Sequence, residues 1–221
     1  MYVYDETVAQ KGSNEVASML FHYLMKRKNF EDKLVIISDG CTSQNKNFVI
    51  LCFLYLLVHS FRMFRKITHV FPYRGHSFLP NDGDFGKIKS VKESVTAESP
   101  EQWNNIIKNC RSSPSAFEVV NVSQDEIFDV KSCVERHFKQ SPDRKNNEMK
   151  SLRMYQIHCL YEDVRTRTSY SDPWSLLPVR NTVPLPNTLS FTKLRDRPIP
   201  IKKAKWKDLE KLLPHLQPEN R

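Results

Sequence analysis

Four residues in the first half of the chain have the types and spacing of a metal site, and they lie in two polar clusters. The first cluster is SDGCTSQNKN (38–47) and the second is RGHSFLPNDGDFGKI (74–88). The candidate residues are Asp39, His76, Asp82 and Asp84. Carboxylates that are brought together repel one another, and they persist where a divalent cation neutralises them. Mg²⁺ suits such oxygen ligands and an anionic phosphate substrate, so the clusters favour a magnesium site.

Each of these residues also has a simpler interpretation. Asp39 stands before a glycine at the end of an apolar run, which is typical of a turn. Asp82 and Asp84 are suited to the N-terminus of a helix, where a carboxylate caps the backbone and complements the helix dipole. His76 taken alone fits an orienting or structural role better than that of a ligand. A single aspartate is therefore weak evidence, and the two clusters in this order are stronger evidence.

The elements predicted around the clusters would bring them together. These elements are a strand at Met1–Tyr4, a helix that begins with Ser13 or Asn14 as N-cap, a strand at Leu34–Ile37, a helix at Phe48–Phe64 and a strand at Ile67–Phe71. The alternation predicts a three-layer α/β core from Met1 to about Val95, with the largely apolar helix at Phe48–Phe64 buried against parallel strands. Because parallel strands end at the same sheet edge, both polar clusters should lie there.

The second half of the chain has more varied patterns. We expect a helix at Glu101–Cys110, a strand at Phe117–Val122, a helix at Glu126–Phe138, a polar linker at Gln140–Ser151, a β-hairpin formed by Met154–Tyr161 and Val164–Tyr170, an extended proline-rich stretch at Pro173–Pro200 and a short helix at Ala204–Leu213. The predicted organisation is an α/β core at 1–95, a helical continuation at 96–139 and a smaller α+β region at 140–221.

Composition narrows the class of protein. The 221 residues are 39% hydrophobic, which is enough for a real core, and the net charge of +9 favours an anionic partner, most simply nucleic acid. Five cysteines without a CxxC pair support neither a disulfide framework nor a zinc finger, and they indicate the nucleus or cytoplasm. The longest apolar run, Phe48–Val58, is shorter than the roughly 20 residues of a membrane span, and the N-terminus lacks signal-peptide features.

Three stretches carry a resemblance to a known family. DETVAQKGSNEVASMLFHYL (5–24), SDGCTSQNKN and FPYRGHSFLPNDGDFGKIK (71–89) resemble successive blocks of a transposon-derived family of RNase H-like, DDE-type transposase-like domains, common in invertebrate genomes and catalogued as a domain of unknown function. The resemblance is specific from Met1 to about Lys89 and weaker beyond. It implies a mixed sheet flanked by helices and Mg²⁺-dependent DNA strand cleavage and transfer by three acidic residues. Asp39 falls on one acidic position of the family, and Asp82 falls on another, with Asp84 as the near alternative.

The chain departs from the family pattern at two points. Thr42 and Ser43 stand where the family usually has paired glycines, so the loop after Asp39 should be stiffer. The resemblance also implies that the first acidic residue lies on a strand that would precede Met1, so we expect an N-terminally truncated and inactive domain. Weak, non-specific DNA binding would then remain. The alternative is a non-catalytic, domesticated remnant that binds nucleic acid or protein. An unrelated α/β enzyme is disfavoured, because no GxGxxG, P-loop or GxSxG motif is present.

The spacing within the second cluster distinguishes its two aspartates. On a helix, Asp82 and Asp84 point about 200° apart, so only one of them can face Asp39. Phe85 and Ile88 should share the buried face, and Asp82 lies along the same stripe. We therefore place Asp82 opposite Asp39, with His76 at the rim and Asp84 capping the helix or facing solvent.

Overall fold

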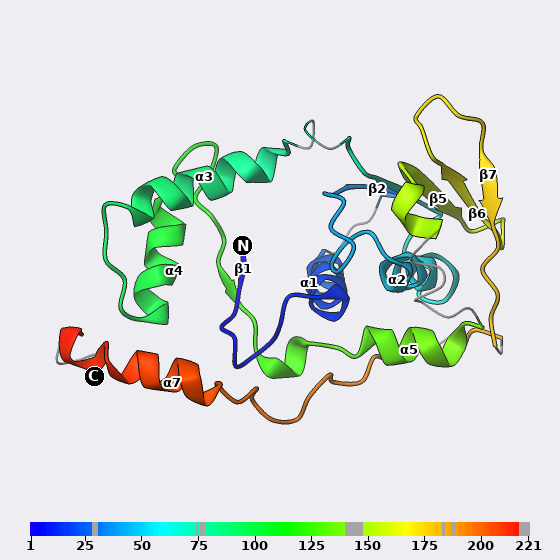
Figure 1. The fold of residues 1–221 in the computed structure, drawn as a ribbon. Helices are drawn as coiled ribbons and strands as arrows, with labels where there is room; N and C mark the ends of the chain where they lie inside the picture. Colours follow the sequence, from blue (N-terminus) through cyan, green and yellow to red (C-terminus); the bar gives the residue numbers. More distant parts are fainter. Residues whose placement is uncertain are drawn as a thin grey trace. The chain divides into compact units, whose positions relative to one another are not determined.

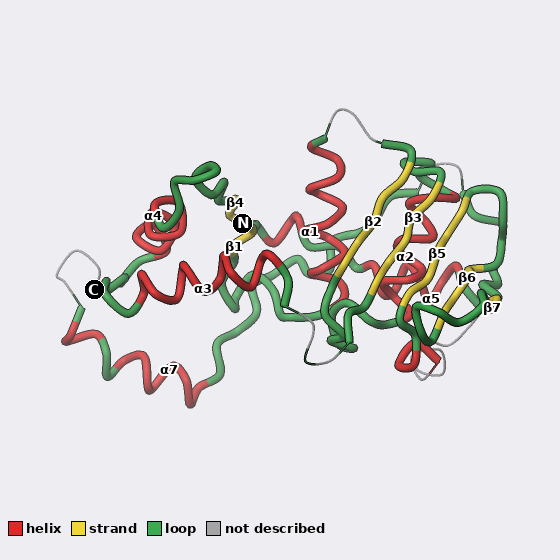
Figure 2. The backbone as a smooth tube through the Cα atoms, turned by 90° about the horizontal axis from the view of Figure 1, so that it is seen from above, coloured by secondary structure: helices red, strands yellow, loops and turns green. Residues whose placement is uncertain are grey.

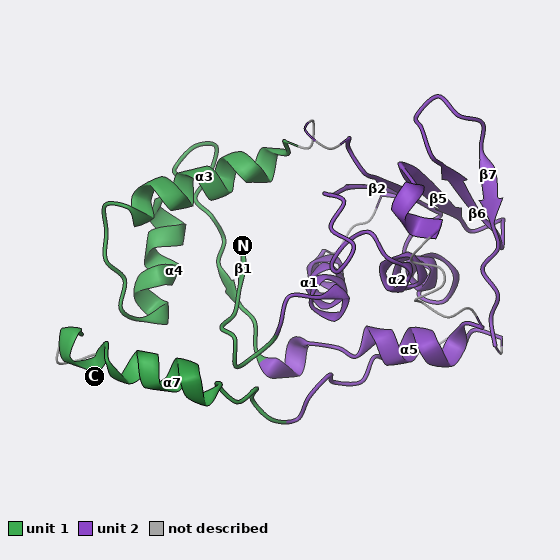
Figure 3. Cartoon of the chain, in the orientation of Figure 1, with its two compact units in different colours: residues 1–9, 78–123, 197–221 green, residues 10–77, 124–196 purple. Residues whose placement is uncertain are grey.

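The computed structural model describes residues 1–27, 31–73, 75, 78–139, 148–182, 184–186 and 189–216. These residues form two compact units, each assembled from separated segments (Figure 3). Unit 1 comprises Met1–Ala9, Phe78–Ser123 and Arg197–Arg221, and unit 2 comprises Gln10–Ser77 and Gln124–Asp196. The ranges 1–95, 96–139 and 140–221 expected from the sequence are consecutive stretches of the chain. Each compact unit instead combines segments that are far apart in the sequence.

Unit 2 contains a five-stranded mixed sheet with the strand order β2-β3-β5-β6-β7 (Figure 1). The strands are β2 (Lys33–Ile37), β3 (Lys66–Val70), β5 (Met154–His158), β6 (Val164–Arg167) and β7 (Ser175–Leu177). β2 and β3 are parallel, with Leu34 opposite Ile67, and β5, β6 and β7 continue from β3 as antiparallel neighbours. The predicted parallel pair and the predicted hairpin are therefore both confirmed, and they belong to one sheet.

One helix forms the centre of the core of unit 2. The helical elements include α1 (Ser13–Lys26), α2 (Phe48–His59), the short 3₁₀ turn η1 (Gln124–Glu126) and α5 (Val130–His137), and residues 148–151 are also helical. Every residue of α2 from Phe48 to Val58 is buried, and α2 contacts α1, α5, β3 and β5. The predicted buried helix is confirmed, although it ends before Phe64. Arg62 takes a positive φ of 54° and the Met63 N–H bonds back to the Leu57 carbonyl, which closes the helix.

The helices cover only one face of the sheet. In Figure 2 the strands β2, β3, β5 and β6 lie in front of the helices, with no described helix of unit 2 over them. Side chains that alternate toward the helices, such as Ile67, Tyr155 and Ile157, are buried, whereas Val35 and Leu176 on the other side are 62% and 64% exposed. The expected mixed sheet flanked by helices is thus confirmed, and the described helices of this unit lie on one side of it rather than forming three layers.

We call the uncovered side the open face. Its strand positions are Lys33, Val35, Ile37, Lys66, Thr68, Val70, Met154, Gln156, His158, Arg165, Arg167 and Leu176. Antiparallel sheets commonly leave one face to solvent, but a parallel pair is usually covered on both faces. The exposed β2 side chains are therefore unusual for a strand with a parallel neighbour.

Unit 1 has its own small set of elements. They are β1 (Tyr2–Val3), α3 (Pro80–Lys92), α4 (Pro100–Asn109), β4 (Val120–Asn121), α7 (Lys203–Glu210) and the 3₁₀ turn η2 (Leu213–His215). β1 pairs in parallel with β4, with Tyr2 opposite Val120. The N-terminal strand was expected in the main sheet, and it instead forms this two-stranded pair with a strand more than a hundred residues later in the chain.

Two local expectations are also corrected. The N-cap of α1 is Gly12 rather than Ser13 or Asn14, so no side chain caps this helix. The Asn14 side chain instead accepts a hydrogen bond from the Lys131 N–H at 2.8 Å, which connects α1 to α5. In α3, Phe85 is 56% exposed rather than buried. No helix in the parts of the chain that the structure describes is long and apolar enough to span a membrane.

Candidate functional site

Asp39 lies two residues beyond the end of β2, in an exposed loop. Its Oδ1 accepts hydrogen bonds from the Cys41 N–H at 3.2 Å and from the Asn45 Nδ2 at 2.6 Å. Its Oδ2 accepts no hydrogen bond from the described residues. Asp39 therefore closes a turn, as the simpler interpretation expected, and it is an exposed residue whose Oδ2 is not used in this turn.

The loop after Asp39 is held by backbone and side-chain hydrogen bonds. The Cys41 carbonyl accepts from the N–H groups of Asn45 and Lys46 at 2.8 and 2.9 Å. Asn47 caps α2, because its side chain accepts from the Ile50 N–H at 3.0 Å and donates to the Thr42 carbonyl at 2.9 Å. The first cluster thus ends as a helix cap, and its aspartate sits in a fixed turn between β2 and α2.

A chain of three polar side chains lies behind this turn. Ser38 Oγ is 2.8 Å from His69 Nε2, and His69 Nδ1 is 2.8 Å from the Tyr155 hydroxyl. Ser38 Oγ also bonds to the Asp39 carbonyl at 3.1 Å. These hydrogen bonds join the end of β2 to β3 and β5, so they fix the strand end that carries Asp39.

Burial determines the protonation states of His69 and Tyr155. Burial lowers the pKa of His69 to about 3 and raises the pKa of Tyr155 well above its ordinary value. Tyr155 therefore keeps its proton, and its only described hydrogen-bond partner is His69 Nδ1. When Tyr155 donates to Nδ1, the neutral ring carries its own proton on Nε2 and donates it to Ser38. A histidine with so low a pKa orients its neighbours and is a poor base near neutral pH.

A buried lysine also belongs to this loop. Lys46 is 4% exposed, its Nζ donates to the Lys150 carbonyl at 2.9 Å, and the same atom lies 5.1 Å from the centre of the Phe71 ring. Our sequence analysis did not identify Lys46, His69 or Tyr155 as site residues. The sequence signal for His69 was its position as a polar residue within the strand KITHV. Such a residue can be predicted to be buried only when its strand is known to lie in the middle of a sheet.

Asp82 and Asp84 of the second cluster belong to unit 1, whereas Asp39 belongs to unit 2. Asp82 caps α3, because its Oδ2 accepts from the Leu79 N–H at 2.7 Å while its own N–H donates to the Leu79 carbonyl. Asp84 forms an ion pair with Arg111 at 3.1 Å, and the Arg111 guanidinium lies 3.8 Å from the Phe117 ring centre. Asp84 was expected to cap the helix or to face solvent, and it is instead a partly buried partner of Arg111, while Asp82 makes the cap.

The expected meeting of the candidate residues stays a prediction. His76 lies outside the described residues, and Asp39 and Asp82 belong to different units. Within the described ranges, no group of three or more His, Cys, Asp or Glu side chains is arranged to hold a metal ion.

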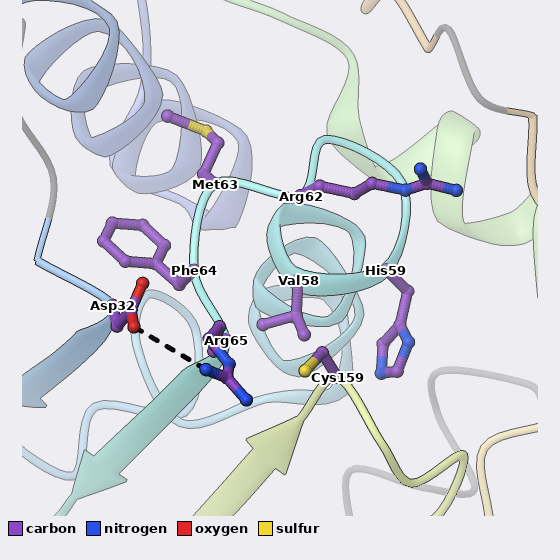
Figure 4. Close-up of a pocket in the computed structure, with 8 residues that line it drawn as sticks. All are labelled: Asp32, Val58, His59, Arg62, Met63, Phe64, Arg65 and Cys159. Atoms are coloured by element: carbon purple, nitrogen blue, oxygen red, sulfur yellow. Dashed lines mark ion pairs between the residues drawn. The ribbon is translucent and has the colours of Figure 1, made fainter.

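A pocket of about 340 Å³ opens at the other end of the sheet in unit 2 (Figure 4). Figure 4 shows the Arg65 side chain directed toward Asp32, at an N–O distance of 3.9 Å, and the Arg62 guanidinium directed away from the other labelled side chains. His59 stacks on Tyr55 with ring centres 4.1 Å apart, and burial lowers its pKa. The mixture of two cations with Val58, Met63, Phe64 and Cys159 does not indicate one reaction.

Unit 1 contains a pocket of about 460 Å³ that is largely apolar. Tyr4, Trp103 and Val122 line it, and the Lys92 ammonium lies 6.0 Å from the Trp103 ring centre. The pocket lies where β1 and β4 meet the start of α4, and it holds no candidate residue of either polar cluster.

Comparison with known proteins places the chain in a family. A family model described as "Domain of unknown function (DUF7869)" matches residues 1–166. Neither the comparison with curated proteins nor that with solved structures found a match. The matched range includes both polar clusters and the strands β2, β3 and β5, and it covers well over half of the chain. The chain therefore belongs to this family of domains of unknown function.

Proposed function

We propose that the chain is an RNase H-like domain of transposase descent that binds DNA, with Asp39 as a ligand of Mg²⁺. The observation that carries the proposal is the position of the exposed Asp39 at the carboxyl end of β2, which is parallel to β3, with its hydrogen bonds from the described residues made to Oδ1. Open α/β sheets gather their ligands at this edge. The sequence blocks quoted above, which lie within the matched family range, add the resemblance to transposases.

The residues around Asp39 have distinct roles in this proposal. Asn45 and the Cys41 N–H hold Oδ1, so Oδ2 is the oxygen that would bind the ion. Ser38, His69 and Tyr155 fix the strand end, since their hydrogen bonds join three strands or strand ends. Mg²⁺ is commonly held by one or two carboxylates together with water and substrate phosphates, and when bound it neutralises phosphate charge during strand cleavage. The resemblance assigns the second acidic position to Asp82, with Asp84 as its alternative, and His76 to the same sequence block.

The expected activity of this chain is binding without cleavage. Asp82 is engaged in capping α3 and Asp84 in an ion pair with Arg111, so strand cleavage and transfer would be the ancestral reaction rather than a present one. The net charge of +9 supports weak, non-specific attraction to DNA, which also favours a nuclear location. A second candidate is a non-catalytic module for nucleic acid or protein, and the cationic open face of the sheet favours it.

Substitution of Asp39 tests the metal site. Mn²⁺ can replace Mg²⁺ as a paramagnetic probe, and Asp39→Asn keeps an acceptor for Cys41 while it removes the charge. We expect weak Mn²⁺ binding by the chain, its loss in Asp39→Asn, and no effect of Asp32→Asn, a control at the opposite end of the same strand. Binding retained in Asp39→Asn would refute the site. In a plasmid-nicking assay with Mg²⁺ we expect no cleavage, and cleavage abolished by Asp39→Asn would show an active enzyme instead.

A further inference from the structure

The charged residues of the five-stranded sheet are all of one sign and all on one face. The strands β2, β3, β5, β6 and β7 contain no aspartate or glutamate. Their lysines and arginines are Lys33, Lys66, Arg165 and Arg167, and each occupies a position of the open face. A face with this composition is complementary to an extended anion.

The cations lie in rows that cross the strands. Lys33 is opposite Lys66, and Lys66 is opposite His158, so three basic side chains stand side by side on β2, β3 and β5. Neighbouring strands are about 4.8 Å apart, so this row extends about 10 Å. Burial and the neighbouring cations Arg65, Lys66 and Arg165 lower the pKa of His158, which reflects the positive potential on this side of the sheet.

Aromatic rings accompany two of the arginines. The Arg165 guanidinium lies 4.7 Å from the centre of the Tyr161 ring, and the Arg167 guanidinium lies 4.2 Å from that of Trp174. Tyr161 is 47% exposed, so part of its ring remains available for a further contact. A guanidinium group that stacks on an aromatic ring is a planar cation held in one orientation. A nucleobase can stack on the guanidinium plane or on the aromatic ring.

A hollow of about 180 Å³ lies between the cationic row and the first arginine–aromatic pair. Its lining residues are Lys66, Gln156, His158, Tyr161, Asp163 and Arg165. The one acidic member, Asp163, forms an ion pair with Arg180 at 3.2 Å, so its charge is partly compensated. The hollow therefore combines cations for a phosphate group with an aromatic edge for a base.

We propose that the open face of the sheet binds single-stranded nucleic acid. Phosphates contact Lys33, Lys66 and Arg165, and bases stack on Tyr161 and on the pair formed by Arg167 and Trp174. A duplex buries its base planes and can use only the cations, so the aromatic rings favour a single strand. The inference rests on the proposed function in one respect only, that the partner is a nucleic acid, and it assigns a surface distinct from the strand end that carries Asp39.

Charge neutralisation on the open face provides the main test. The test variant is Lys33→Gln, Lys66→Gln and Arg165→Gln in one chain, and the probe is a fluorescent 20-nucleotide oligothymidylate measured by anisotropy. The control removes the same charge from exposed helix positions on the other side of unit 2, namely Lys26→Gln, Lys131→Gln and Arg136→Gln. We expect at least a ten-fold loss of affinity in the test variant, with a salt slope shallower by about two, and a much smaller loss in the control.

An aromatic variant tests base stacking separately from charge. Tyr161→Ala should weaken oligothymidylate binding about five-fold or more and leave binding of a duplex of equal length nearly unchanged. The exposed ring of Tyr23 lies on α1, on the helix side of the sheet, with the Arg27 guanidinium 5.7 Å from its centre, and it provides the control Tyr23→Ala. Circular dichroism of every variant checks that the fold is retained.

The outcomes separate this inference from the proposed function. Equal oligothymidylate binding by the test and control variants refutes the open face as the binding surface and leaves the DNA-binding proposal standing. Absence of binding to single strands and duplexes alike at low salt refutes both. Sedimentation that shows a dimer of the chain, dissociated by the open-face substitutions, identifies a second copy as the occupant and overturns the inference. Loss of affinity confined to the open-face variant with Asp39→Asn unaffected supports it.

Discussion

His69 shows how a single buried side chain can position a loop. Its ring connects Ser38 to Tyr155 through bonds of 2.8 Å on both nitrogens, so the ring must stay neutral and keep one tautomer to satisfy both partners. The cost of protonating the ring is large, because burial holds its pKa near 3. The residue therefore links the acid stability of the fold to the geometry of the Asp39 turn.

We predict that His69 makes the fold sensitive to acid. An unfolded histidine binds a proton below about pH 6.5, whereas the folded His69 binds one only near pH 3. Its contribution is thus fully present above pH 6.5 and is lost as the pH falls. The free energy of unfolding should decrease by about 2 kcal/mol through this group between pH 7.5 and pH 5.

Urea unfolding at the two pH values measures this effect. His69→Gln should be less stable at pH 7.5 and should lose less stability on acidification than the unsubstituted chain. His59→Gln, where burial also lowers the histidine pKa, should show the same trend more weakly. An unsubstituted chain as stable at pH 5 as at pH 7.5 would contradict the prediction.

At the scale of elements, α2 is the helix that packs against the centre of the sheet. Its residues from Phe48 to Val58 are buried on every side, since β3 and β5 lie against one side and α1 and α5 against others. The opposite side of the same sheet exposes Val35, Ile37 and Leu176. The two sides of the sheet therefore differ greatly in what a substitution costs.

Two leucine substitutions measure this difference. Leu56 on α2 is 0% exposed, and Leu176 on the open face is 64% exposed. Leu56→Ala should lower the free energy of unfolding by about 2–5 kcal/mol, because it removes buried methyl groups and leaves a cavity. Leu176→Ala should change it by no more than about 0.5 kcal/mol. Similar losses in both variants would show that the open face is covered in solution.

At the scale of the whole molecule, charge is the property most relevant to function. The chain carries a net charge of +9, and the sheet concentrates four cations on one face without any acidic residue. Such an excess of positive charge attracts nucleic acid without sequence preference, and the strength of the attraction depends on the number of counterions released.

We therefore predict that duplex DNA binding weakens steeply with salt. With about three or four phosphate contacts, the logarithm of the association constant should fall with the logarithm of salt concentration at a slope of about −3. Anisotropy titrations of a labelled duplex between low and high salt measure this slope. Binding that is independent of salt would argue against phosphate recognition and in favour of a protein partner.

Local sequence patterns determined much of the secondary structure. The apolar β-branched run at Leu34–Ile37 and the apolar run that begins at Phe48 predicted β2 and α2, because backbone preference and side-chain periodicity act over a few residues. The polar spacing of 38–47 also indicated the turn at Asp39, and Asn47 caps α2 as an amide in that position can. These features depend on neighbours in the chain, so the sequence alone contains them.

Tertiary structure decided which partners the same residues meet. β1 pairs with β4 rather than with the main sheet, and Asp82 rather than Asp84 caps α3. His69 forms hydrogen bonds to Ser38 and Tyr155, which come from two other segments of the chain. The cations of β2, β3 and β6 became one surface only when their strands were placed side by side. Strand order and register arise from contacts between residues far apart in the chain, and periodicity within one segment contains no information about them.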